Sequence, residues 1–184
     1  MAADRFFDAH KLTAAQIWRK ARLATEAGRL KSTRQALDIV QPKSDPVLSE
    51  LWARPARWLG QYAANPRLAS TEMAVLALVR LSASEPEQAE KLMRTLWQPV
   101  LSAEQRNWVW GVLGKQSAMR LDDQSLGLYK KVTHLGDLHD ELLAWMARAA
   151  LRAGSTPAWP QVELAIRRSE EHTSELQSRV DISY

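Results

Sequence analysis

The chain has 184 residues, a net charge of +4, 46% apolar residues and no cysteine. This length suits one domain of roughly 100 to 200 residues, and the absence of cysteine excludes disulfides and thiolate metal sites. No run approaches the ~18 consecutive apolar residues that a membrane-spanning helix needs. The mildly basic charge does not by itself indicate nucleic-acid binding.

The first third of the chain reads as a series of short helices. Thr13 and Gln16 form a capping-box pattern that starts a helix, which we expect to stop at Gly28. A second helix is predicted over residues 32–40, before Pro42. The next predicted helix begins with Asp45 as its cap and Pro46 in its first turn. The short helix after it begins at Pro55 and ends near residues 65–66.

The remaining elements are also predicted to be helices. Residues 71–82 are apolar nearly all round, which predicts a central helix packed between others. Ser102 and Gln105 repeat the capping-box pattern at the start of a helix that runs to about Met119. The other predicted helices cover residues 86–97, 123–132 and 138–153, with Gly154 as a stop, and a last one starts at Thr156-Pro157.

Residues 168–184 resemble a translated sequencing adapter. Read codon by codon, a common short-read library adapter gives Arg-Ser-Glu-Glu-His-Thr-Ser-Glu-Leu-Gln-Ser, the string at residues 168–178. After a variable index the same frame gives Ile-Ser-Tyr, the string at residues 182–184. We therefore expect a non-native tail, in which His172 and Glu175 should not be read as a site.

The predicted fold class is all-α, without a sheet. About nine or ten short helices joined by brief turns favour antiparallel helix pairs stacked into an α-superhelix or solenoid over residues 1–167. No strict repeat period is visible, so a degenerate solenoid is favoured over tetratricopeptide or ankyrin repeats.

The eight tryptophans are more readily explained as core residues than as stacking platforms. Trp18, Trp108 and Trp145 lie on apolar helical faces, where a large ring fills the space between layers. Trp52 and Trp58 flank a turn and are better candidates for exposure. Trp110 is two positions from Trp108, so we expect its ring to lie on another face of the helix, towards an adjoining hairpin.

Positive charge gathers around the first predicted turn, but a solvated surface is favoured over an anion-binding face. The aromatic interleaving of a single-strand nucleic-acid track is missing there. Two further arginines, Arg80 and Arg148, sit in apolar helices, and we expect carboxylates such as Glu72 or Glu141 to pair with them. The cations of the first turn are Arg19, Lys20, Arg22, Arg29, Lys31 and Arg34.

The sequence predicts no catalytic, cofactor-binding or metal site. His134 and His139 are five residues apart across Gly136, whereas ligands on one helix face need a spacing of three or four. Their acidic neighbours Asp137, Asp140 and Glu141 do not change this. No phosphate loop, nucleophile elbow or Cys/His pair is present.

Four segments together resemble the helical domain of soluble lytic murein transglycosylases. In that family, paired helices form a U-shaped or ring-like scaffold that carries a lysozyme-like catalytic domain. The resemblance covers nearly all of residues 1–167 in order. Its segments are ARLATEAGRLKSTRQAL (21–37), MAVLALVRLSASEP (73–86), RNWVWGVLGKQSA (106–118) and LLAWMARAALRAG (142–154).

The resemblance implies a parent enzyme that cleaves the bond between N-acetylmuramic acid and N-acetylglucosamine and leaves a 1,6-anhydromuramoyl end. The family's catalytic glutamate lies in a Glu-Ser pair followed by Gly-Leu-Met-Gln, and neither string occurs here. Neither Glu104 nor Glu141 inherits that role. The expected product is a scaffold fragment, incomplete at both ends, without catalytic domain, cofactor or membrane span.

The expected partners are peptidoglycan strands, through the missing catalytic domain, and that domain itself; nucleic acid is not expected. The resemblance also implies a periplasmic location, with a signal upstream of Met1. The alternative is a stand-alone helical-repeat adaptor that binds a protein or an anionic polymer through its concave face.

Overall fold

The computed structural model describes residues 12–154 and 167, and every regular element within them is a helix or a helical turn. This confirms the all-α prediction. The helix predicted from Thr156-Pro157 and the adapter-like tail at residues 168–184 lie outside the described residues. The chain divides into two compact units, Met1–Ser84 and Glu85–Tyr184, and each is described by itself.

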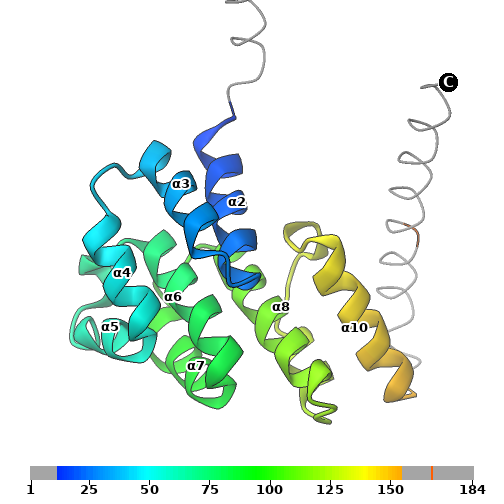
Figure 1. Ribbon diagram of the computed structural model, residues 1–184. Coiled ribbons are helices and arrows are strands. Elements are labelled where there is room, and N and C mark those ends of the chain that lie inside the picture. Colours follow the sequence, from blue (N-terminus) through cyan, green and yellow to red (C-terminus); the bar gives the residue numbers. More distant parts are fainter. Residues whose placement is uncertain (1–11, 155–166, 168–184) are drawn as a thin grey trace, which may run out of the picture. The chain divides into compact units, whose positions relative to one another are not determined.

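The first unit is built from helices that pack on their sequence neighbours and on one central helix (Figure 1). α2 packs against α3 and α6, and α4 and α5 also contact α6. The elements are α2 (Ala14–Glu26), α3 (Leu30–Val40), α4 (Asp45–Ala53), α5 (Pro55–Gln61), the 3-10 turn η1 (Pro66–Leu68) and α6 (Thr71–Ser84).

Local sequence signals account for the α2–α3 hairpin. The side chain of Thr13 accepts a hydrogen bond from the amide of Gln16, and the Gln16 side chain accepts one from the Thr13 amide, so the predicted capping box is present. Gly28 follows the helix with φ +69°, a left-handed conformation that glycine adopts at little cost. The two helices are tied by their buried hydroxyls, since Thr25 Oγ1 and Thr33 Oγ1 lie 3.2 Å apart.

α6 is the central helix of the first unit, as its apolar sequence predicted. All residues from Met73 to Val79 are buried. Its first turn carries Glu72, which forms an ion pair with Arg22 of α2 at 2.8 Å. The Arg22 side chain is 3% exposed, so this pair fixes α2 on α6 from inside the packed layer.

The predicted cap of α4 differs from the structure. Asp45 is not the cap of α4 but its first residue, preceded by Ser44, whose side chain makes no capping hydrogen bond. The Asp45 carboxylate instead pairs with Arg34 on α3. Pro46 in the first turn agrees with the prediction, since its missing amide hydrogen costs nothing there.

Replacing Glu72 by Gln should destabilise the first unit. The substitution removes the carboxylate that the buried Arg22 contacts, and we expect the free energy of unfolding to fall by about 2 to 3 kcal/mol. Urea denaturation measures it. Arg34→Gln breaks the exposed pair with Asp45 and serves as control, with a loss below about 1 kcal/mol. Equal losses of unfolding free energy in the two variants would show that burial does not make the Arg22–Glu72 pair more stabilising than the exposed pair.

The second unit is organised around α8, the longest helix among its described residues, which contacts α7, α9, α10 and the turn η3. Ser102 and Gln105 form the predicted capping box at its start. In Figure 1, α8 and α10 lie side by side. The elements are α7 (Pro86–Leu92), the π-helical turn η2 (Met93–Trp97), α8 (Ala103–Met119), α9 (Ser125–Tyr129), the 3-10 turn η3 (Leu135–Asp137) and α10 (Asp140–Arg152).

Two glycines let other elements approach α8 closely. A Cβ atom at Gly111 would lie 2.7 Å from Leu138 Cδ2, and one at Gly114 would lie 2.9 Å from atoms of the Tyr129 ring. Tyr129 and Leu138 are themselves buried. The glycines are therefore required here by packing, although glycine lowers helix propensity.

One predicted helix changes its helical type along its length, and another is shorter than expected. The element predicted over residues 86–97 is α-helical only to Leu92 and continues as the π-helical turn η2. The one predicted over residues 123–132 is limited to α9. Beyond α9 the amide of Thr133 donates to the Asn107 side chain, a long-range hydrogen bond that competes with helix continuation.

Gly114→Ala separates packing from helix propensity. Propensity alone favours alanine by about 1 kcal/mol, but overlap with the Tyr129 ring should make the variant less stable by about 1 to 3 kcal/mol. Gly127→Ala is the control, because a Cβ there meets nothing within 4 Å and should stabilise slightly. Thermal melting of both variants measures the difference, and a stabilised Gly114→Ala protein would refute the close approach.

Candidate functional site

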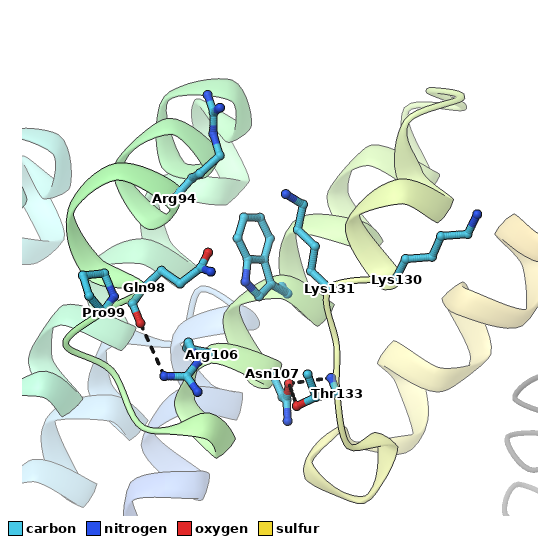
Figure 2. A pocket seen from close by; sticks show the side chains of 9 residues that line it. Arg94, Gln98, Pro99, Arg106, Asn107, Lys130, Lys131 and Thr133 are labelled. Atoms are coloured by element: carbon cyan, nitrogen blue, oxygen red, sulfur yellow. Dashed lines mark hydrogen bonds between the residues drawn. The ribbon is translucent and has the colours of Figure 1, made fainter.

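The most substantial candidate site is a cleft of about 640 Å³ in the second unit (Figure 2). Its walls come from η2 and the turn after it, from the first half of α8 and from the segment that follows α9. The lining residues are Arg94, Gln98, Pro99, Arg106, Asn107, Trp110, Lys130, Lys131 and Thr133. We call this site the cationic cleft.

The cationic cleft is lined by four cations and no carboxylate. Arg94, Lys130 and Lys131 are exposed, and none of them forms an ion pair with any residue in ranges 12–154 and 167. Arg106 is held by the backbone, since its Nη1 donates to the carbonyl of Leu101 at 2.8 Å. Three exposed cations and one cation bound to the backbone give the cleft a positive potential that attracts anions.

The π-helical turn η2 places Arg94 at the cleft. Met93 and Trp97 of this turn are completely buried, while Arg94 is exposed. The turn thus anchors two large apolar side chains and presents the guanidinium to solvent. Single π turns of this kind are frequent at functional sites in proteins.

Lys131 lies against the one aromatic residue of the cationic cleft. Its Nζ is 4.5 Å from the centroid of the Trp110 ring, a cation–π distance. Trp110 is only 2% exposed, so its ring is packed into the wall and the ammonium covers what remains open. A contact of this kind contributes about 0.5 to 1 kcal/mol at an exposed site and orients the lysine.

Asn107 holds the segment that carries the lysines. It is 1% exposed, and its Oδ1 accepts hydrogen bonds from the Thr133 amide at 2.9 Å and from Thr133 Oγ1 at 3.2 Å. Its Nδ2 donates to Asp137 Oδ2 at 2.6 Å. One buried side chain on α8 therefore fixes two points of the loop between α9 and α10, as the bonds to Thr133 show in Figure 2.

Asn107→Ala should release this loop. Loss of both the acceptor for Thr133 and the donor to Asp137 is expected to cost about 1 to 3 kcal/mol and to speed amide exchange at Thr133. Hydrogen exchange followed by NMR measures that amide directly. Thr133→Val is the control, because it removes only the hydroxyl bond and keeps the amide bond. Unchanged protection at Thr133 in Asn107→Ala would contradict the role assigned to Asn107.

The tryptophan predictions are partly confirmed. Trp108 is buried at 0% exposure, while Trp18 and Trp145 are half-buried. The prediction for Trp58 is wrong: it is 2% exposed and packs against the Tyr62 ring at 5.0 Å. Its position in the short helix α5 turns it inward, which its place beside the Arg54-Pro55 turn did not reveal.

The basic residues around the first turn do not form one surface. Arg22 is buried in its pair with Glu72, and Arg34 pairs with Asp45. Arg22 therefore lies within the packed layer, whereas Arg34 lies at the surface. The buried Arg22 thus departs from the predicted solvated surface, whereas Lys20, Arg29 and Lys31 are exposed.

The expected partners of Arg80 and Arg148 are not the observed ones. Glu141 pairs with Lys115 of α8 at 2.7 Å. Arg80 is half-buried with its guanidinium 5.2 Å from the Trp52 ring centroid, and Arg148 is exposed with its guanidinium 4.9 Å from that of Trp145. Aromatic faces, rather than carboxylates, are the neighbours recorded for these arginines.

The two histidines of the loop before α10 have separate neighbours. Nδ1 of His134 lies 3.2 Å from Asp137 Oδ1, and the His139 ring packs at 5.2 Å from the Trp108 ring. Among the described residues no group of three or more potential ligands could hold a metal ion. Asp137 is instead part of the Asn107 network.

The cationic cleft could not be predicted from the sequence. Arg94, Arg106 and the Lys130-Lys131 pair are distant in the chain and carry no motif. The adjacent lysines after a short helix were the only local signal, and such pairs are common on surfaces. Only the packing of η2 and the post-α9 segment on α8 brings these residues together.

Comparison with known proteins identified no matching family model, no matching curated protein and no matching solved structure. Within the described ranges, no helix combines the length and the apolar character needed to cross a membrane.

Proposed function

We propose that the chain is a non-catalytic helical scaffold from a periplasmic lytic murein transglycosylase. The observation that supports this best is where the four resembling segments lie. Segment 21–37 forms most of the α2–α3 hairpin, and segment 73–86 covers most of the buried α6. Segments 106–118 and 142–154 cover most of the packed α8–α10 pair. The resemblance thus falls on the helices that carry the packing, in an all-helical chain.

The chemistry of the cationic cleft agrees with a supporting role. Glycosidic bond cleavage needs a carboxyl group as acid or base, and no carboxylate lines this cleft. The carboxylate of Glu141 lies elsewhere, since it forms an ion pair with Lys115 and is largely exposed. In this proposal, cleavage of the glycan belongs to a separate Glu-Ser domain of the parent enzyme.

The second candidate is a stand-alone adaptor that binds an anionic polymer. The cationic cleft is the specific observation in its favour, because cations without carboxylate partners attract anions whatever chain carries them. The two candidates differ in what the gene encodes after Arg167, not in the cleft itself.

A genomic read across the codon of Arg167 tests the proposed function. We expect the native frame to continue into a domain with a Glu-Ser pair followed by Gly-Leu-Met-Gln. The 184-residue chain itself should release no anhydromuropeptides from isolated sacculi, as mass spectrometry of the digest would show. A native stop codon soon after Arg167 would favour the adaptor, and release of anhydromuropeptides would refute a non-catalytic scaffold.

A further inference from the structure

We propose that the cationic cleft of the second unit binds an acidic glycan, meaning an extended sugar chain with spaced carboxylates. The inference goes beyond the scaffold role by naming a ligand class and the residues that bind it. Its choice of source, the peptide-bearing glycan of the cell wall, rests on the proposed function. The preference for an acidic glycan rests on the cleft alone.

The arrangement of the cations favours an extended ligand. In Figure 2, Arg94, Lys131 and Lys130 stand at successive places along the opening, and Lys130 extends away from Arg94. Side chains that stand apart suit several separate charges better than one small anion at a single point. All three are exposed and pair with no carboxylate among the described residues, so a ligand need not displace an existing ion pair there.

The neutral groups of the cleft suit a sugar. The Gln98 side chain is exposed, and the only hydrogen bond recorded for this residue with the cleft, from Arg106, goes to its backbone carbonyl at 3.4 Å. Its amide therefore remains for hydroxyl or acetamido groups, which need both donors and acceptors. Thr133 Oγ1 keeps acceptor capacity after donating to Asn107.

The remaining features argue against single-stranded nucleic acid and against a peptide bound as an added strand or in an apolar groove. Single-stranded nucleic acid binds by stacking bases on open aromatic faces, whereas Trp110 is 2% exposed and faces Lys131. Two of the recurring modes of peptide recognition need a sheet edge to which the peptide adds a strand, or an apolar groove that it fills. The described residues contain no strand, and Pro99 and Trp110 are the only apolar residues lining the cleft.

The test compares two charge-matched triple variants of the full chain. Arg94→Gln/Lys130→Gln/Lys131→Gln removes the three exposed cations of the cleft and leaves Arg106 and Asn107 in place. Lys20→Gln/Lys31→Gln/Arg67→Gln removes the same charge from exposed positions of the first unit. Circular dichroism and melting establish that both variants fold before binding is measured.

Calorimetric titration is done with soluble peptide-bearing peptidoglycan strands, the same strands with amidated carboxyls, neutral chitooligosaccharide, polygalacturonate, inorganic phosphate and a mixed-sequence single-stranded oligonucleotide. We expect wild type and the first-unit variant to bind the acidic strands alike. The cleft variant should bind about tenfold more weakly, as three modest exposed ion pairs imply. Amidation should weaken binding similarly, and added salt should weaken it further.

The outcomes separate this inference from the proposed function. Binding of polygalacturonate through the cleft without binding of wall strands would uphold the acidic-glycan site and count against the wall-scaffold proposal. Equal binding of neutral and acidic glycans, equal affinity in the two triple variants, tighter binding of the oligonucleotide, or binding of phosphate alone would each overturn the acidic-glycan site.

Discussion

The buried side chain of Asn107 is the constraint on which the cationic cleft depends. It lies on α8 and accepts two hydrogen bonds from Thr133 while donating one to Asp137, so it satisfies its own polar atoms and those of the facing loop. A buried amide with these bonds costs little, but without them it would be expensive. The same bonds determine where Lys130 and Lys131 emerge beside Trp110.

The packing on α8 supports this hydrogen-bond network on both sides. Before the loop, the Tyr129 ring lies over Gly114, and after it Leu138 lies over Gly111. Apolar contact thus fixes the two ends of the loop, while Asn107 fixes its middle. Three separate contacts therefore hold one short segment. They give the backbone of Lys130 and Lys131 a defined position, although the two side chains are exposed.

Local signals in the sequence predicted most of the helices but not the cationic cleft. The capping boxes at Thr13 and Ser102 depend on residues three apart, so their geometry follows from the sequence alone. The end of α9 depends on Asn107, which is 26 residues from Thr133, and the cleft joins Arg94 to Lys131 across α8. Such contacts exist only after the helices have packed, and surface cations carry no periodic pattern that would reveal them.

The glycan-binding cleft proposed for the second unit is built on the Asn107 network. An NMR titration of the ¹⁵N-labelled chain with peptide-bearing peptidoglycan strands tests it most directly, because it locates the ligand. We expect saturable chemical-shift changes that are largest at the Trp110 indole N–H and at the backbone amides of Lys131 and Thr133. Shifts that are largest in α2 and α3, or that never saturate, would contradict it.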